Sequence, residues 1–241
     1  MRISIEHMKL LKKAPNSAYN DIMPEFLFHS NKLEGSTFSE AELEKLVESG
    51  LVTGSHTIDD VLETKNSIDA FGFVIDSLGD PIDKDFLCKL NAILMDKTQA
   101  AADGFSGRYK VIPNRIRNSG VQVALPSDVN DAMESLLSDW ESRPHNLESI
   151  AAFHIRFEHI HPFQDGNGRI GRFLMLKQCI ENDIDLIVID QEYGDSYKAW
   201  LEVAQTQGDA EYFIDVLIKC QERFEEKMRE RGVCRLLSEM P

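Results

Sequence analysis

Apolar residues recur at helical spacing along most of this sequence. After a Thr57-x-x-Asp60 start signal, apolar positions 61, 68, 71, 75 and 78 predict a helix from about Ile58 to Leu78. The same pattern predicts later helices from about Gly168 to Glu181, Asp195 to Gln205 and Asp209 to Arg229. Further helices are indicated by Phe86, Leu87, Leu90, Ile93 and Leu94; by Val129, Met133, Leu136, Leu137 and Trp140; and by Ile150, Phe153, Phe157 and Ile160. The sequence therefore predicts a mostly α-helical protein.

One stretch, from Asp103 to Pro126, lacks the helical period. It holds two β-prone pieces, Arg115-Ile116-Arg117 and Val121-Gln122-Val123, with Asn118-Ser119-Gly120 as a turn between them. This pattern predicts a short β-hairpin. The alternative is an ordinary exposed connection, although long loops in compact domains often carry function.

Composition and charge narrow the class of protein. Of the 241 residues, 42% are apolar, which is enough for a core of one or two domains. The net charge of −15 repels polyanions and argues against general nucleic-acid binding. Four cysteines without CxxC spacing indicate neither a disulfide framework nor a zinc site. The longest aliphatic run, Leu186 to Ile189, is too short for a membrane span, and the N-terminus has no apolar signal region, so we expect a cytoplasmic protein.

Candidate chemistry is concentrated between His161 and Arg172, in the sequence HPFQDGNGRIGR. Gly166 and Gly168 free the backbone just before a predicted helix, so the segment is a loop that leads into a helix N-terminus. Unpaired amides at that position, aided by the helix dipole, bind anions such as phosphate. Arg169 and Arg172 are three positions apart and project to the same side, where they can clamp a polyphosphate.

Two other residues of this segment suit chemistry at a phosphate. Asp165 supplies the hard oxygen ligand that Mg²⁺ uses on nucleotides, although an Asp here could instead cap the next helix. His161 titrates near neutrality and could accept a proton from an attacking hydroxyl, although a histidine packed at a helix end is the alternative. Together with the glycines and arginines, they predict a site for chemistry on a nucleotide phosphate. His154 and His159 are five positions apart and do not share a helix face, so we do not expect them to form a metal cluster.

This segment resembles the HPFx(D/E)GN(G/K)RxxR motif of the Fic family and matches it at every defined position. The similarity covers most of the chain from about Ile58. It implies the Fic fold, a helical bundle with a short β-hairpin flap beside the active-site loop, over residues 58–241, preceded by an N-terminal helical segment over residues 1–57. Family members chiefly transfer AMP from ATP to a protein hydroxyl. The resemblance therefore implies a protein adenylyltransferase that uses ATP with Mg²⁺ or Mn²⁺.

The resemblance also implies roles for individual residues. His161 would be the general base, Phe163 a hydrophobic anchor of the loop and Asp165 the metal ligand. Gly166, Asn167 and Gly168 would form the anion nest, Arg169 and Arg172 would hold phosphates, and Tyr193, Tyr197 and Trp200 lie where relatives form the nucleobase pocket. The spacing of the last two is equally typical of a core. The expected flap, with Arg115, Ile116, Arg117, Val121, Gln122 and Val123, would dock a target protein by β-augmentation.

A second segment, Ser30 to Gly35, ends a short helical pattern that follows Pro24. Ser30 and Glu34 are four positions apart on one face, and a Glu at a helix C-terminus opposes the dipole and so favours a cationic partner. A surface glutamate is the alternative. The segment is similar to the inhibitory (S/T)xxxE(G/N) motif of Fic proteins. By that resemblance, Glu34 would pair with Arg172 and occupy the room of the γ-phosphate, while Ser30 would help fix the helix.

The leading hypothesis is a self-inhibited adenylyltransferase that modifies a target protein and itself. One alternative is the same site working with another nucleotide, or removing AMP with Glu34 positioning water. The other is a non-catalytic nucleotide-sensing module, against which intact His161 and Asp165 argue, because a pure binder needs neither. The resemblance allows a homodimer, and we expect no membrane or nucleic-acid partner.

Overall fold

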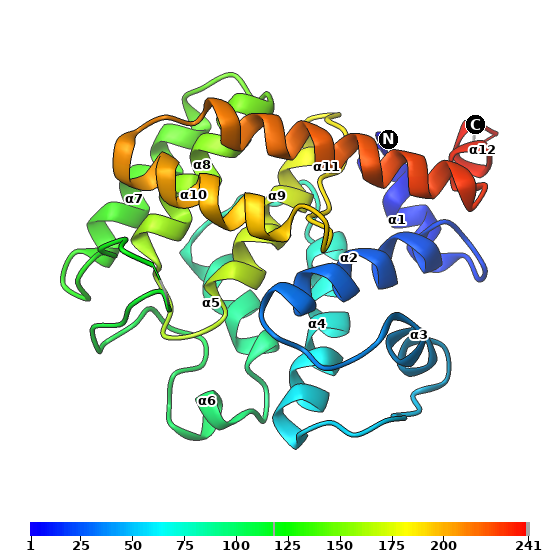
Figure 1. The fold of residues 1–241 in the computed structure, drawn as a ribbon, viewed down its shortest axis with the longest axis horizontal. Helices are drawn as coiled ribbons and strands as arrows, with labels where there is room; N and C mark the ends of the chain where they lie inside the picture. Colours follow the sequence, from blue (N-terminus) through cyan, green and yellow to red (C-terminus); the bar gives the residue numbers. More distant parts are fainter. Residues whose placement is uncertain (118, 240–241) are drawn as a thin grey trace.

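The computed structural model of the protein describes residues 1–117 and 119–239, and these residues form twelve helices joined by loops (Figure 1). In chain order they are α1 (Ile5–Lys13), α2 (Tyr19–Leu33), α3 (Glu40–Ser49), α4 (Ile58–Asp76), α5 (Lys84–Leu94), α6 (Gln99–Ala102), α7 (Val129–Glu141), α8 (Leu147–Ile160), α9 (Asn167–Glu181), α10 (Gly194–Gln207), α11 (Glu211–Glu230) and α12 (Val233–Ser238). The prediction of a mostly helical protein is confirmed.

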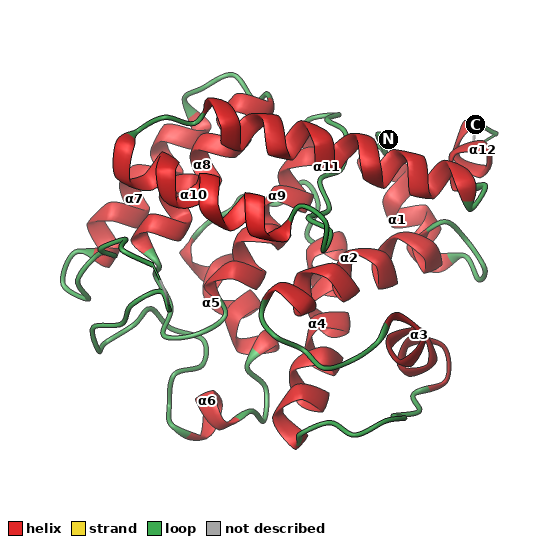
Figure 2. Cartoon of the chain, viewed as in Figure 1, coloured by secondary structure: helices red, strands yellow, loops and turns green. Residues whose placement is uncertain are grey.

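The prediction of a short β-hairpin between Arg115 and Val123 is wrong, because no strand occurs among the described residues (Figure 2). A hairpin needs a ladder of backbone bonds between its two arms, and here polar groups bond elsewhere. The side chain of Asn114 donates to the Phe163 carbonyl at 2.9 Å, and the Gly120 N–H donates to a carboxylate oxygen of α10 at 3.1 Å. A lone two-stranded ribbon is also only marginally stable in water. Asn118, in the expected turn, lies outside the described residues.

Helix starts follow the local capping chemistry. The Thr57 hydroxyl accepts the Asp60 N–H at 3.1 Å and begins α4 at Ile58, which confirms the predicted start signal. The helix carrying Ser30 begins earlier than expected, at Tyr19, so Pro24 lies inside α2 and does not precede it. Pro24 is the sixth residue of α2, past the first turn, where a proline removes one backbone hydrogen bond; here the helix continues through it, and the prediction took it for a boundary.

Helix α9 runs through the middle of the molecule and packs against α2, α4, α5 and α8 (Figure 1). Thirteen of its fifteen residues are buried, including Arg169 and Arg172. A helix that is enclosed by other helices needs no polar face. Charged side chains on such a helix can pair with polar groups of the helices around it. A single apolar cluster surrounds it and includes residues from Met1 to Val233. The fold therefore places two arginines of the candidate motif in the interior.

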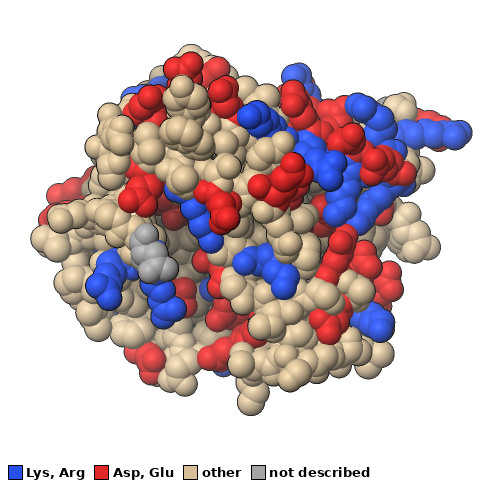
Figure 3. Space-filling view, viewed as in Figure 1, with Lys and Arg blue, Asp and Glu red and all other residues tan. Residues whose placement is uncertain are grey.

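The surface carries both signs of charge. On the face shown in Figure 3, Lys and Arg side chains lie among Asp and Glu side chains, most densely over α11 and α12. Ion pairs within and beside these helices include Arg229 with Glu225 at 2.8 Å and Arg231 with Glu40 at 2.7 Å. Within the described ranges, no helix combines the length and the apolar character that crossing a membrane would require.

Candidate active site

The candidate loop connects the end of α8 to the start of α9. His161 is the C-cap residue of α8 and has left-handed backbone dihedrals, with φ 52°. Its N–H donates to the Phe157 carbonyl at 2.9 Å, which turns the chain away from the helix axis. Gly166, with φ 84°, is the N-cap residue of α9, a conformation that favours glycine. The loop therefore leads into a helix N-terminus, as the sequence predicts.

Buried hydrogen bonds hold this loop in place. The side-chain amide of Asn167 accepts the Phe163 N–H and donates to the Phe163 carbonyl, both at 2.8 Å. The Phe163 ring is fully buried and packs edge-on against Tyr109 at 5.4 Å. Asn91 of α5 donates to the Asp165 carbonyl at 3.1 Å. The Asn167 side chain, expected in the anion nest, is thus occupied in closing the loop.

Glu34 reaches the loop from the end of α2. Its Oε1 lies 2.6 Å from Nη2 of Arg172, whose side chain is 4% exposed. Ser30 binds the same guanidinium twice, with its hydroxyl accepting from Nε at 2.9 Å and its carbonyl accepting from Nη2 at 3.0 Å. Burial alone would raise the pKa of Glu34, but the guanidinium groups of Arg172 and Arg169 lower it. The structure therefore brings together the two segments that the sequence singles out.

Gly168 makes the approach of Glu34 possible. A Cβ atom at this position would lie 2.3 Å from Oε1 of Glu34 and 3.0 Å from Nη1 of Arg172. Real side chains do not tolerate contacts as short as the first of these. A side chain at position 168 would therefore force the Glu34 carboxylate to shift from its present place on Arg172.

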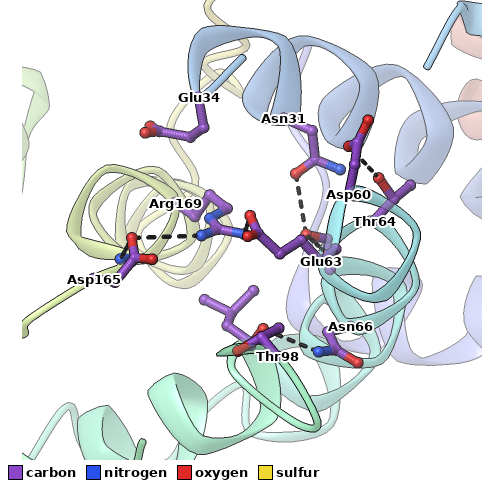
Figure 4. A network of polar contacts seen from close by, with 12 residues as sticks. Asn31, Glu34, Asp60, Glu63, Thr64, Asn66, Thr98, Asp165 and Arg169 are labelled. Carbon is purple, nitrogen blue, oxygen red and sulfur yellow. Dashed lines mark hydrogen bonds and ion pairs between the residues drawn. The ribbon is translucent and has the colours of Figure 1, made fainter. Parts of the chain in front are cut away.

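The second arginine of the motif also has a carboxylate partner. Nη1 of Arg169 lies 2.6 Å from Oε2 of Glu63 on α4, and its Nη2 lies 3.8 Å from Oδ1 of Asp165 (Figure 4). Burial and the nearby Asp165 raise the pKa of Glu63 against the attraction of Arg169. Nε of Arg169 is buried and has no hydrogen-bond partner among the described residues. Each motif arginine is thus held by a carboxylate from an earlier helix.

Asp165 fits a metal that is shared with a nucleotide and not one enclosed by protein. Its side chain is 55% exposed, and Oδ1 accepts the Gly166 N–H at 2.6 Å. Within the described residues, no three His, Cys, Asp or Glu side chains are grouped so as to hold a metal ion. Mg²⁺ on nucleotides needs only one or two carboxylates, with phosphate oxygens and water completing its shell. One exposed carboxylate beside a helix N-terminus meets that requirement.

His161 is held neutral by its surroundings. Burial and the charge of Lys110 lower the pKa of the imidazole to about 4. Lys110 is itself buried, with Nζ 2.8 Å from Oδ1 of Asn114 and 3.3 Å from the Ile160 carbonyl, and burial lowers its pKa to about 8. A neutral imidazole can accept a proton at neutral pH, which is what a general base must do.

The expected nucleobase residues have different surroundings, although all three lie at or on α10. Tyr197 is buried, and its hydroxyl lies 2.7 Å from Nε2 of His154. Burial and Arg172 lower the pKa of His154 to about 3, so the imidazole is neutral. Tyr193 is partly buried at the start of α10, and the Trp200 ring stacks on Tyr212 at 4.5 Å. Tyr197 therefore lies in the protein interior, in agreement with the alternative that its helical spacing is that of a core residue.

Sequence reasoning missed the residues that support the loop from other elements. Glu63, Lys110, Asn114 and Glu158 contact or face motif residues, but no short motif contains them. Glu63 lies 106 positions before Arg169 in the chain. The one available signal was Glu158, a charged residue on the otherwise apolar face of a predicted helix that ends at His161.

Comparison with known proteins finds similarity to one family. The Fic/DOC family model matches residues 81–179, which contain the candidate loop. Curated relatives named "Protein adenylyltransferase Fic" include that of Aedes aegypti, 27% identical over 224 residues, and that of Drosophila melanogaster, 26% identical over 220 residues. Both alignments cover 88% of this chain but 42% of the relative, so the chain spans less than half the length of these proteins.

Solved structures agree on the fold. A Fic domain-containing signaling protein from Bacteroides thetaiotaomicron superposes with a TM-score of 0.75 at 25% identity, over 91% of this chain and 94% of the other. A fragment of Fic-1 from C. elegans gives a TM-score of 0.76 at 20% identity, over 94% of this chain and 71% of the other. The helices outside residues 81–179 are thus also similar to those of Fic proteins.

Proposed function

We propose that this protein is an adenylyltransferase that moves AMP from ATP onto a hydroxyl of a target protein and that Glu34 restrains this activity. The observation that carries the proposal is the arrangement around the start of α9, where a neutral His161 lies in the same loop as an anion-binding helix terminus and two buried arginines. The names of the curated relatives, protein adenylyltransferases, support this class of reaction.

The reaction needs one proton acceptor and several fixed positive groups. The target hydroxyl oxygen attacks the α-phosphorus, the bond from that phosphorus to the bridging oxygen of pyrophosphate breaks, and His161 takes the hydroxyl proton. Pyrophosphate then leaves with the bonding electrons. The α9 amides and Arg169 orient the phosphates, and Arg172 holds the γ-phosphate. Because these groups are fixed by burial, they need little reorganisation during the reaction.

Asp165 would hold Mg²⁺ or Mn²⁺ when nucleotide is bound. The ion supplies neutralisation of phosphate charge. Asp165 contributes one exposed carboxylate oxygen to that site, and its backbone is fixed by Asn91. Asp165 is the one carboxylate in the sequence from His161 to Arg172, and Glu63 of α4 is paired with Arg169.

Glu34 restrains the site by competition. Its carboxylate and the γ-phosphate need the same guanidinium, and a carboxylate 2.6 Å from Arg172 leaves no place for the phosphate on that nitrogen. ATP then binds in a pose from which the α-phosphorus cannot meet the hydroxyl. Release of Glu34 from Arg172 is therefore the step that permits transfer.

The test is a labelling experiment with two forms of ATP. Label on the α-phosphate should enter protein, and label on the γ-phosphate should not. The matched pair His161→Ala and His159→Ala separates the proposed base from an exposed histidine on the same helix, and only the first should abolish labelling. Incorporation of γ-label would indicate phosphoryl transfer. Tight ATP binding without either label, in a Glu34→Gly protein given host lysate, would contradict the enzyme and favour a sensing module.

A further inference from the structure

The buried carboxyl of Glu158 lies close to the His161 imidazole, and the proposed reaction does not use it. Glu158 is three positions before His161 on α8, and its side chain is 7% exposed. Its Oε2 is 3.8 Å from Nδ1 of His161, while Oε1 has no hydrogen-bond partner among the described residues. Buried polar atoms are rarely left unpaired in folded proteins, so such an atom beside a candidate base calls for a functional explanation.

The His161 imidazole also has an atom without a hydrogen-bond partner. Nδ1 of His161 is also buried and has no hydrogen-bond partner among the described residues. An imidazole that works through Nε2 must carry its proton on Nδ1, and a group that accepts from Nδ1 fixes this tautomer. In nucleophile and base pairs on other folds, a third side chain orients the base in this manner.

A glycine on α9 makes room for the Glu158 carboxyl. A Cβ atom on Gly171 would lie 2.4 Å from Oε1 of Glu158 and 2.8 Å from Cε1 of His154. Position 171 is one of the undefined positions of the HPFQDGNGRIGR segment, so the anion-binding motif itself does not demand glycine there. The glycine thus leaves room for a carboxyl between α8 and α9, although burying an unpaired carboxyl is unfavourable.

We propose that Glu158 is a positioning residue for His161, accepting a hydrogen bond from Nδ1 so that Nε2 faces the target hydroxyl. The two atoms are 3.8 Å apart in this structure, so one of the two side chains must move for the bond to form. During transfer the hydroxyl proton goes to Nε2, the Nδ1 proton stays in place, and Glu158 neither gains nor loses a proton of the reaction. Burial raises the pKa of the Glu158 carboxyl to about 8, although the charge of Arg172 opposes this shift.

Only the predicted effect of Glu158 on the transfer rate rests on the proposed function. In a Glu34→Gly background, Glu158→Leu should lower the transfer rate at saturating ATP by about ten- to a hundredfold, the cost of misplacing a reacting group by about 1 Å. The ATP concentration for half-maximal rate should change less than twofold, because Glu158 does not touch nucleotide. Glu158→Gln, which keeps an oxygen acceptor, should recover most of the loss. Glu148→Gln, an exposed change on the same helix, is the control.

Two measurements keep the proposal testable if the leucine variant folds poorly or no transfer is found. Gly171→Ala leaves Glu158 intact but displaces its carboxyl, and it should reproduce the loss. Nitrogen NMR of His161 should show one tautomer, with the proton on Nδ1, in the parent protein and a mixture in Glu158→Leu and Gly171→Ala. A parent protein with mixed tautomers, or variants with the parent's spectrum and rates within twofold, would overturn the proposal. Absence of transfer with the expected NMR change would instead contradict the proposed function alone.

Discussion

Replacing Glu34 by glycine should activate the protein, and the structure sets the size of the gain. Glu34 contributes one charge-assisted hydrogen bond, at 2.6 Å, to a guanidinium that Ser30 also holds with two bonds. Hydrogen bonds to charged groups contribute about 1.5 to 3 kcal/mol, and the 38% exposure of the Glu34 side chain favours the lower half of that range. If the competent state is reached only when this bond breaks, its population is reduced about ten- to a hundredfold.

The assay is incorporation of α-labelled AMP, into the protein itself and into lysate proteins, for the parent and Glu34→Gly. Glu48→Gly, an exposed change on α3, controls for loss of a charge. The gain should disappear in the double variant Glu34→Gly with Arg172→Ala, since directly coupled residues are not additive. Unchanged transfer in Glu34→Gly, or a gain that survives without Arg172, would refute the competition. If Glu34→Gly instead abolishes hydrolytic removal of AMP, Glu34 positions water in the reverse reaction.

Three further expectations concern the metal, the second arginine and buried charge. Asp165→Ala should eliminate transfer and the Mg²⁺ dependence of nucleotide binding in calorimetric titrations, whereas an unchanged metal titration would support a capping role. Glu63→Gln should tighten ATP binding about three- to thirtyfold by freeing Arg169, and weaker binding would mean that Glu63 orients the arginine instead. The pKa of His154 is about 3 in the folded protein against an ordinary 6.5, so the unfolded chain binds the extra proton and stability falls as pH drops below 6.5. Between pH 7.5 and 5 this costs about 2 kcal/mol in denaturant unfolding, a loss that His154→Asn should remove and exposed His159→Asn should not.

Sequence reasoning succeeded where the information is local. The loop from His161 to Arg172 carries its chemistry within twelve consecutive residues, and the start of α4 is set by a side chain three positions from the amide that it caps. Gly166 and its positive φ follow from the same local logic.

Sequence reasoning failed where tertiary contacts decide. The residues from 115 to 123 have β-prone side chains, but the surrounding segment bonds to the α8–α9 loop and to α10 in place of a partner strand. The partnership of Glu63 with Arg169 joins positions 106 residues apart, and periodicity reports only that Glu63 lies on a helix. Pairing of Glu34 with Arg172 spans 138 residues, and the resemblance alone anticipated it.

The contact of Gly168 with Glu34 also constrains how such chains can diverge. Because a side chain at position 168 would force the Glu34 carboxylate to move from Arg172, substitutions at the two positions are coupled. Under the proposed competition, a lineage that acquires a larger residue at 168 would lose the restraint by Glu34 in the same step and would have to tolerate or silence the released activity. A lineage that first loses Glu34 leaves position 168 open to new side chains, and with them to new chemistry at the phosphates. The order in which positions 34 and 168 change, and not only the final pair of residues, would therefore decide which descendants of this sequence survive.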